Sequence, residues 1–526
     1  MSAAGQGKRT SYSHSEAVFT AEQVRLLDRI CINDYGIDGY GLMVQAGEAV
    51  FSSLLSQWSD VQQLLVLCGS GNNGGDGFVI ARLAKQHNIQ VQLVLIGELD
   101  DLKNEAKQAA EDALEAGLRL TPIDHIQWPN GNEDTVIIDA LLGTGLNSDV
   151  SADIEKLITK VNQNPCDVLA VDVPSGLNAT TGQIQGTCIQ AVSTVTMLAH
   201  KQGLFTGDGP MMSGQVSLAP LTVPNAAREN QVATGSLVNW QQLSQLAFFA
   251  QRPMNSHKGM FGHVMIIGGD LGCGGAVSLA AGSALRCGTG LVSVATRPEH
   301  VAAVIARHPE AMVHGVNSGQ DLEPLLARAD VIVAGPGLGQ SYWGEQLLQQ
   351  VMKLETPVVL DADALNILAK KRLAHNLSKR ISVITPHPGE AARLLNADPV
   401  AFDESVDNHA IQADRFEHAK TLAEMYSSSV VLKGLGSVVQ TQRQMSICDN
   451  GNAGMATAGM GDVLSGIVGG LLAQHSQDQQ ELATYLHDLV CSAVCLHSAA
   501  ADQMAEHGQV GLLAGDLEQA IWQLLK

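Results

Sequence analysis

Short runs of β-branched and aliphatic residues alternate with helical stretches along most of the chain, and this alternation limits the possible folds more than any other feature. It is the pattern of parallel sheets covered by helices, so we expect an α/β protein. The first half predicts strands at 64–68, 91–96, 136–139 and 168–173, and a helix at 152–161. A second series predicts strands at 263–267, 291–295, 331–334, 358–360, 381–384 and 430–432, then a β pair at 437–441 and 445–448.

The two series are separated by residues 221–235, which show little periodicity and contain Pro224, Asn225, Asn230 and Gly235. We interpret this segment as a linker. A chain of 526 residues is also too long for one ordinary core. We therefore expect two domains, residues 1–230 and 231–526.

The composition excludes some classes of partner. The formal net charge is −22, whereas binding to nucleic acid or to an anionic membrane needs clustered Lys and Arg. The nine cysteines form no CxxC pair, which favours reduced thiols in a cytoplasmic protein. Residues 1–16 lack the apolar core of a signal peptide. The apolar run 463–473 is shorter than the ~20 residues that span a bilayer. We expect neither nucleic acid nor membrane as a partner.

A glycine-rich loop, GSGNNGGDG at residues 69–77, lies between the strand expected at 64–68 and a helix through Phe78. Glycines let successive backbone N–H groups point the same way, and a helix N-terminus adds partial positive charge. The loop therefore predicts a phosphate site that needs no lysine, and it is not a Walker pattern because no Lys-Ser/Thr follows. A plain tight turn is the alternative.

Two aspartates end predicted strands, Asp139 in IIDALLGTG and Asp172 in DVPSG. Open α/β sheets bind ligands beyond the carboxyl ends of their strands. We therefore expect both carboxylates to project into one crevice with the glycine loop. Either aspartate could instead be a helix cap or a turn former.

A second glycine-rich loop, GNAGMATAGMGD at residues 451–462, precedes the apolar run 463–473. It predicts a backbone cradle for phosphoryl charge and a helix that opens at Asp462. Asp462 would lie where an attacking hydroxyl binds and take its proton. The alternative for this residue is an ordinary helix cap.

Three further segments of the second half have two interpretations each. KGLGS at 433–437 follows a strand and is either a nucleotide contact or a surface hairpin turn. His387 lies between two prolines and is either a ligand contact or a buried structural histidine. Asp361 and Asp363 in LDADALN either contact metal or water or cap the following helix.

Three motifs of the first half are NNGGDG, IIDALLGTG and DVPSG. Together they resemble the NAD(P)H-hydrate epimerase family, the YjeF N-terminal domain. The first helix region of that family is also matched, by Tyr35–Ile37, Leu42-Met43 and Ala46-Gly47. Where the family often has Glu-Asn, this chain has Val44-Gln45. The resemblance implies a Rossmann-like three-layer sandwich, a catalytic Asp172, and a potassium ion bound by Asn73, Asp139 and Ser175. It implies that the dinucleotide is bound by Asn72, Asn73, Gly74, Gly75, Asp76, Gly143, Thr144, Gly145, Leu146, Asn147, Ser148, Asp149 and Asp172.

Five segments of the second half belong together: GNAGMATAGMGD, TPHPGE, GPGLG at 335–339, LDADALN and NSHKG at 255–259. They resemble the ADP- or ATP-dependent NAD(P)H-hydrate dehydratase family, a branch of the ribokinase-like fold. The resemblance implies that Asp462 is catalytic and that Mg²⁺ and ADP are used. The hydrate would contact Ala276, Gly337, His387 and Asp462. The adenine nucleotide would be bound by Lys433, Gly434, Leu435, Gly436, Ser437 and Gly461.

Together the resemblances cover nearly the whole chain and imply a bifunctional repair enzyme for NADHX and NADPHX, the hydrated forms of NADH and NADPH. An epimerase would interconvert the R and S forms, and a dehydratase would convert the S form to NAD(P)H, releasing AMP and phosphate. We also expect a homo-oligomer. Two other interpretations stay open from the residues alone: a small-molecule kinase of the ribokinase-like fold, and a dinucleotide sensor without catalysis.

Overall fold

The computed structural model describes residues 17–131, 134–229, 231–246, 249, 251–371, 373–397 and 405–526. The chain divides into two compact units, one up to Ser236 and one from Leu237. Residues 1–16, on which the signal-peptide expectation rests, and Asn230, at the expected boundary, lie outside the described residues. Within the described ranges, no helix is both long and apolar enough to cross a membrane.

The N-terminal unit is built on a six-stranded parallel sheet of order β3-β2-β4-β5-β6-β8. Cys68 on β2 lies opposite both Leu95 on β3 and Ala140 on β4, so the carboxyl ends of these strands are level. The strand order reverses between β2 and β4, which is where such sheets bind ligands. The strands are β2 (Gln63–Cys68), β3 (Gln90–Leu95), β4 (Thr135–Ala140), β5 (Asp167–Val171), β6 (Ser193–Met197) and β8 (Gln215–Ala219).

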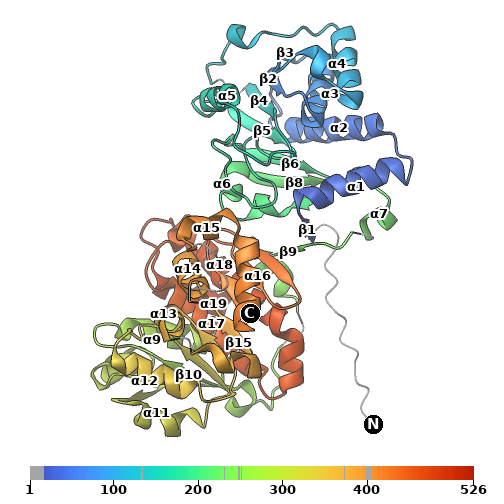
Figure 1. The fold of residues 1–526 in the computed structure, drawn as a ribbon. Helices are drawn as coiled ribbons and strands as arrows, with labels where there is room; N and C mark the ends of the chain where they lie inside the picture. Colours follow the sequence, from blue (N-terminus) through green and yellow to red (C-terminus); the bar gives the residue numbers. More distant parts are fainter. Residues whose placement is uncertain are drawn as a thin grey trace. The chain divides into compact units, whose positions relative to one another are not determined.

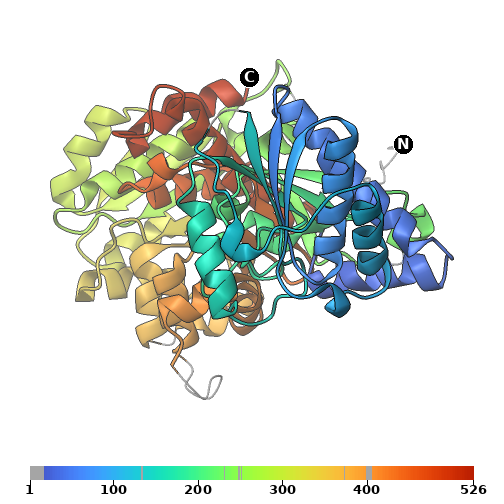
Figure 2. The same cartoon turned by 90° about the horizontal axis from the view of Figure 1, so that it is seen from above.

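Helices cover both faces of this sheet, as Figures 1 and 2 show. One apolar core joins the sheet to α1 (Ala21–Asn33), α2 (Gly39–Gln57), α3 (Asn72–Gln86) and α4 (Asn104–Glu115), and a second joins its other face to α5 (Ala152–Asn162). The expected three-layer arrangement is thereby confirmed. Outside the sheet, β1 (Ala17–Phe19) pairs with β7 (His200–Lys201) and with β9 (Gly235–Val238). Short helices are α6 (Gly209–Ser213), η1 (Leu99–Asp101), η2 (Ile123–His125) and η3 (Gln202–Phe205).

Two expectations for this unit were wrong in detail. The segment 69–77 is not one loop, because α3 begins at Asn72 with Gly71 as its N-cap. The segment 221–235 is not an irregular linker, because it contains α7 (Asn225–Glu229), which follows Pro224. Proline is favoured at a helix start, where its missing N–H has no partner to lose.

The C-terminal unit has a larger sheet, in which β12-β11-β10-β13-β14-β15-β16 run parallel and β17 and β18 follow antiparallel. Its strand order reverses between β10 and β13, which predicts a second ligand crevice. All strands expected in this half are confirmed, and β12 is additional. The strands are β10 (His263–Ile267), β11 (Leu291–Thr296), β12 (Met312–Gly315), β13 (Val331–Ala334), β14 (Val358–Leu360), β15 (Ser382–Ile384), β16 (Ser429–Leu432), β17 (Val438–Gln440) and β18 (Met445–Cys448).

Because parallel crossovers are right-handed, the reversal places the helices before and after it on opposite faces. Four helices of this unit pack on one another: α9 (Gly274–Arg286), α17 (Met460–Gln474), α18 (Gln479–Ala505) and α19 (Leu517–Leu524). The crossovers after the reversal carry α11 (Gly319–Leu326), α12 (Tyr342–Val351), α13 (Ala362–Lys371), α14 (Pro388–Leu395) and α16 (Arg415–Tyr426). Shorter elements are α8 (Trp240–Leu243), α10 (Val301–Arg307), α15 (Asn408–Ala413), η5 (Lys258–Phe261), η6 (Pro298–His300), η7 (Ala374–Lys379), η8 (Ala453–Met455) and η9 (Ala514–Asp516).

Candidate active sites

A cavity of about 520 Å³ opens at the carboxyl ends of β2, β4 and β5, where the strand order reverses. Its volume is in the range of small-molecule sites. Eight of the residues implied by the first resemblance line it: Asn72, Asn73, Asp76, Gly143, Thr144, Gly145, Leu146 and Asp172.

The other residues implied for the dinucleotide do not line this cavity. Asn147, Ser148 and Asp149 are outside its lining. Gly74 and Gly75 are in the first turn of α3, where a side chain has no room. A Cβ on Gly74 would lie 1.8 Å from the carbonyl oxygen of Gly69. These two glycines therefore let the helix approach its neighbours. The N–H of Gly69 already donates to the Ala140 carbonyl at 3.0 Å, so the N–H groups left for an anion are those of residues 70 and 71 and of the first turn of α3.

Asp172 is held in an unusual conformation at the mouth of β5. Its φ of +66° lies in the left-handed region that non-glycine residues rarely adopt, and such strain clusters at functional sites. Its Oδ1 accepts hydrogen bonds from Met197 N at 2.9 Å and Thr196 Oγ1 at 3.3 Å, and it forms an ion pair with Lys201. The side chain of Lys201 is fully buried and also donates to Thr196 Oγ1 and the Met197 carbonyl. Asp172 and Lys201 thus both line the cavity, and the ammonium group is fixed beside the carboxylate.

Further carboxyl groups line the same cavity, namely Asp28, Asp76 and Glu105. Burial is the main cause that raises the pKa of Asp76 well above its ordinary value, and the charges of Asp172 and Asp28 add to it. The pKa of Asp28 is raised by burial first and by Glu105 second. Of these groups, Asp76 is the one whose neutral form is most favoured beside Asp172, and a neutral carboxyl group can donate a hydrogen bond to a ligand.

Asn73, Asp139 and Ser175 are brought together below the cavity. Ser175 Oγ donates to Asp139 Oδ1 at 2.5 Å and receives a bond from Leu142 N at 2.8 Å, while Asn73 Nδ2 donates to the Leu142 carbonyl at 3.1 Å. Asp139 is completely buried and is not among the lining residues, so the expectation that it projects into the crevice was wrong. It bends back instead, because its carboxylate accepts from the backbone N–H groups of Leu141 and Ser175.

The chemistry of this group fits a hard cation. Burial raises the pKa of Asp139 to about 6 although Ser175 and Leu141 donate to it, so its charge is only partly compensated. Carboxylate, hydroxyl and carbonyl oxygens are the ligands that suit hard cations such as potassium. A cation beside Asp139 would stabilise its ionised form.

In the C-terminal unit, the loops after β10 and β13 meet at the strand reversal. Gly269 N donates to the Pro336 carbonyl at 3.0 Å and Asp270 N to the Gly337 carbonyl at 2.6 Å. Gly337 has a φ of +56°, and a Cβ there would lie 3.1 Å from the Cβ of Ala276 on α9. Gly337 and Ala276, both implied for the hydrate, are therefore neighbours.

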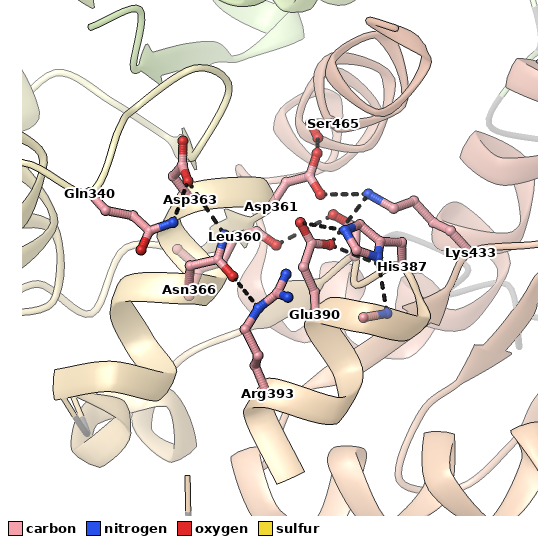
Figure 3. A network of polar contacts seen from close by, with 12 residues as sticks. Gln340, Leu360, Asp361, Asp363, Asn366, His387, Glu390, Arg393, Lys433 and Ser465 are labelled. Carbon is pink, nitrogen blue, oxygen red and sulfur yellow. Dashed lines mark hydrogen bonds and ion pairs between the residues drawn. The ribbon is translucent and has the colours of Figure 1, made fainter. Parts of the chain in front are cut away.

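A network of charged side chains joins β14, α14, β16 and α17 beside this point (Figure 3). Lys433 Nζ lies 2.8 Å from Asp361 Oδ1 and 4.0 Å from Glu390 Oε2, and Ser465 Oγ donates to Asp361 Oδ2 at 2.7 Å. Burial alone lowers the pKa of Lys433, but the charges of Asp361 and Glu390 outweigh it and raise the pKa above its ordinary value. Lys433 is therefore a permanent cation in this unit.

The aspartates of LDADALN do not cap the helix that follows them. Asp361 belongs to the network above, and Asp363 accepts from Gly339 N at 3.0 Å and from Gln340 Nε2 at 3.1 Å (Figure 3). The two side chains therefore tie the GPGLG loop and Lys433 to the end of β14.

Asp462 is in the first turn of α17. The helix begins at Met460 rather than at Asp462, and its N-cap is Gly459 without a side-chain hydrogen bond. The expected helix start was therefore wrong, and Asp462 is not its cap. A Cβ on Gly461 would lie 3.3 Å from Lys433 Nζ and 3.4 Å from Asp361 Oδ2, so the helix start adjoins the network. Burial, and then the charge of Asp361, raise the pKa of Asp462 to about 7.

His387 and the segment after Lys433 border the same network. The side chain of His387 is 51% exposed, so it is not a buried structural histidine. It caps α14, with Nδ1 accepting from Gly389 N at 3.0 Å. Residues 433–437 connect antiparallel β16 and β17, so they do form a hairpin turn. Gly434 is needed there because a Cβ would lie 2.7 Å from buried Arg415.

Sequence reasoning missed Lys201 and Thr196 behind Asp172, and Glu390 and Ser465 beside Lys433. No local pattern marks a buried lysine whose partner is 29 residues away. Glu390 carried a signal in TPHPGE, where a glutamate three residues after an N-cap completes a capping box, as the structure shows.

Comparison with known families gives two matches. Residues 39–203 match a family model described as YjeF-related protein N-terminus, and residues 264–523 match one described as NAD(P)H-hydrate dehydratase. The matches fall one in each unit and include most of the residues described above.

Whole-length relatives are also found. The chain is 43% identical over 503 residues to the bifunctional NAD(P)H-hydrate repair enzyme Nnr of Coxiella burnetii, covering 95% of this chain and 97% of the relative. It is 42% identical over 523 residues to the enzyme of the same name from Escherichia coli, covering 98% and 96%. A crystal structure of ADP/ATP-dependent NAD(P)H-hydrate dehydratase from Bacillus subtilis, co-crystallised with ATP and Mg²⁺, is 27% identical, with a TM-score of 0.44 and coverage of 55% of this chain and 96% of that one.

Proposed function

The chain belongs to the family of bifunctional NAD(P)H-hydrate repair enzymes, and from this membership we propose which side chains carry its two reactions. The N-terminal unit is the epimerase, which interconverts the R and S forms of NADHX and NADPHX. The C-terminal unit is the dehydratase, which converts the S form to NADH or NADPH with ADP and releases AMP and phosphate. The domain limits are those expected from the sequence, residues 1–230 and 231–526.

In the epimerase, Asp172 is the proton carrier. The hydrated carbon bears both a hydroxyl and the ring nitrogen. When the bond from this carbon to the nitrogen breaks, the hydroxyl becomes a carbonyl and its proton moves to the nitrogen. Reclosure on the other face of the carbonyl returns the proton and inverts the carbon. Asp172 lines the cavity, and its ion pair with Lys201 fixes its position. A positioned carboxylate is sufficient for such a transfer. The strained backbone of Asp172 supports this role, since strain of this kind is retained where function requires it.

Asn73, Asp139 and Ser175 would hold K⁺ below this cavity. Its charge would stabilise the ionised form of buried Asp139 and fix the loop after β4, through the Leu142 carbonyl that Asn73 contacts. Replacing K⁺ by choline should therefore slow epimerisation and leave dehydration unchanged. Equal rates in the two salts would contradict the assignment.

In the dehydratase, Asp462 accepts the proton of the substrate hydroxyl while that oxygen takes the terminal phosphoryl group of ADP. The N–H groups at the start of α17, near Gly461, and the cation Lys433 lie beside the phosphoryl path and stabilise its charge. The ring nitrogen then expels phosphate, and loss of a proton from the adjacent carbon restores the dihydronicotinamide. The nucleotide is contacted by Gly434, Leu435, Gly436 and Ser437. The hydrate is contacted by Ala276, Gly337 and His387.

Mg²⁺ would enter with the nucleotide. Among the described residues, no group of three or more His, Cys, Asp or Glu side chains could hold a metal. Magnesium usually takes one or two carboxylates plus substrate phosphates, and Asp361 is the nearest buried carboxylate to Gly461. Bound there, the ion would neutralise charge on the transferred phosphoryl group.

The remaining assignments concern partners and location. The ligands are small molecules, NADHX, NADPHX and ADP. All nine cysteines are free thiols, which supports a reducing, cytoplasmic setting. Homo-oligomer formation stays a prediction from the sequence, for light scattering of the purified chain to decide.

The single observation that carries the proposal is that each matched family contains one unusual aspartate: Asp172 has a strained backbone and lines the first cavity, and Asp462 has a raised pKa and lies at the start of α17. Incubation with an epimer mixture tests it. Without ADP the R and S forms should equilibrate, and with ADP all of the hydrate should become reduced coenzyme. Failure of either step removes the corresponding assignment.

A further inference from the structure

A second cavity of about 930 Å³ lies in the N-terminal unit and is used by neither proposed reaction. It opens beyond the carboxyl end of β3, between η1, η2 and the first turns of α5. Its volume is in the upper range of ligand sites. The lining combines apolar side chains with an aromatic ring and charged groups, among them Leu120, Ile123, Trp128, Glu98, Asp124 and Lys160.

The cavity adjoins the epimerase cavity. Ile96 lines both of them. The turn after Ile96 lies against the glycine loop, since a Cβ on Gly97 would be 3.7 Å from the Cβ of Ser70. Gly97 has a φ of +112°, a backbone conformation that side chains rarely adopt. The two cavities are therefore neighbours, with residues 70 and 97 at their common border.

The far wall of the second cavity is fixed before any ligand binds. Gln127 and Gln92 of β3 exchange two hydrogen bonds, of 3.0 and 3.3 Å, and Thr121 N donates to the Leu93 carbonyl at 2.8 Å. These bonds hold the segment that carries Trp128 against the sheet. A preformed wall lowers the entropy cost of binding.

The distance between the cavities matches the two ends of a dinucleotide. Asp172 follows β5 and Glu98 follows β3, and these strands are three positions apart in the order β3-β2-β4-β5. At about 4.8 Å per strand, they are separated by roughly 14 Å. In sheets of this class the nucleotide pyrophosphate crosses the first glycine loop, and an acidic residue after the next strand contacts the adenosine ribose. Here the glycine loop follows β2 and Glu98 follows β3.

Resting on the proposed epimerase function, we propose that the second cavity binds the adenosine half of NAD(P)HX while the first binds the hydrated nicotinamide. The adenine stacks on Trp128, and the ribose lies toward Glu98. The backbone N–H groups of Ser70, Gly71 and the first turn of α3 bind the pyrophosphate between them. The cavity thereby selects dinucleotides over mononucleotides.

The test compares NADHX with the hydrate of reduced nicotinamide mononucleotide, which lacks adenosine, in the full chain without ADP so that only epimerisation is measured. Trp128→Ala removes the stacking ring, and Asp124→Trp fills the cavity from an exposed position of η2. Each should raise KM for NADHX about tenfold, as loss of one stacked base does, and leave kcat/KM for the mononucleotide unchanged. Trp128→Phe keeps a smaller ring and should raise KM for NADHX by less than Trp128→Ala does. Asp60→Trp, the same change at an exposed residue before β2, should have no effect.

The remaining outcomes distinguish failure of this proposal from failure of the proposed function. Unchanged KM for NADHX in both cavity variants overturns the assignment of the second cavity. So does a parallel loss with both substrates, because the cavity would then support the fold or the nicotinamide end. Equal kcat/KM of the wild type for both substrates also overturns it, since adenosine would contribute nothing. If the wild type epimerises neither substrate, it is the proposed function that fails.

Discussion

At the residue scale, Asp462 gives the sharpest test because its protonation state must change near neutral pH. Its pKa is raised to about 7, chiefly by burial. A base acts only when ionised, so kcat/KM for dehydration should rise with pH through about 7 and level off above it. Asp361→Asn removes the charge that contributes to the shift, so its rising limb should move to lower pH. Profiles of kcat/KM for S-NADHX measure both because they report groups of the free enzyme, and a flat profile between about pH 6 and pH 8 would exclude Asp462 as the base.

The ion pair in the epimerase cavity predicts an asymmetry in stability. Both residues line the cavity, but the side chain of Lys201 is fully buried, whereas that of Asp172 is 14% exposed. Asp172→Ala leaves a buried ammonium without its partner and should lower the free energy of unfolding by about 3 kcal/mol. Lys201→Met leaves a carboxylate that water can reach through the cavity, so the loss should be smaller. Urea unfolding of both variants gives the order, and the reverse order would show that the pair is not arranged as described.

The residues of both candidate sites were predictable from the sequence where they lie in glycine-rich segments or directly after strands. Asp172 and Asp462 are in motifs with several glycines, and parallel strands bring such motifs together whatever the rest of the sequence is. Lys201, Ser465 and the inward turn of Asp139 were not predictable. Each depends on a partner distant in the chain, and only the folded backbone specifies which one it meets.

At the element scale, the start of α3 shows why a glycine-rich segment was misread. Gly74 and Gly77 suggested a loop, yet both are helical. A Cβ on Gly77 would lie 2.7 Å from Ala140 Cβ and from Cys68 Sγ. Glycine is retained here for close packing on the sheet, although it costs helix stability. The low helix propensity of glycine therefore predicted the wrong start for α3, because the packing of the helix on the sheet decides where it begins.

This packing can be tested with two matched substitutions. Gly74→Ala should improve helix propensity but place Cβ 1.8 Å from the Gly69 carbonyl oxygen, and we expect a loss of about 3 kcal/mol. Gly71→Ala, where nothing lies within 4 Å of the new Cβ, should cost only what a poorer N-cap costs, about 1 kcal/mol or less. Thermal unfolding compares them. Equal stability of the two variants would mean that α3 does not begin at Asn72.

Most strands of the two sheets were found because each is a compact apolar run between turns, and the expectations for β2, β4, β10 and β13 were close to the observed limits. Six strands were not found, namely β1, β6, β7, β8, β9 and β12. They have only two to five residues, and their pairing is decided by tertiary neighbours rather than by an alternating pattern.

At the scale of the whole molecule, two sheets with a strand reversal each account for two reactions in one chain. Hydration of the coenzyme yields both epimers, whereas the dehydratase accepts one, so the epimerase supplies the other. The alternation of strands and helices was sufficient to predict two α/β units. Its change of pattern near residue 230 placed their division close to Ser236, where the structure divides the chain.

The most direct test of two independent sites is complementation between full-length variants. With ADP and an epimer mixture of NADHX, Asp172→Asn should regenerate NADH only from the S form and then slow to the rate of spontaneous epimerisation. Asp462→Asn should regenerate none. Mixing the two variants should restore complete conversion, because each supplies the reaction that the other lacks. If Asp172→Asn alone consumes both epimers at the wild-type rate, or if Asp462→Asn alone yields NADH, the assignment of one aspartate to each reaction is contradicted.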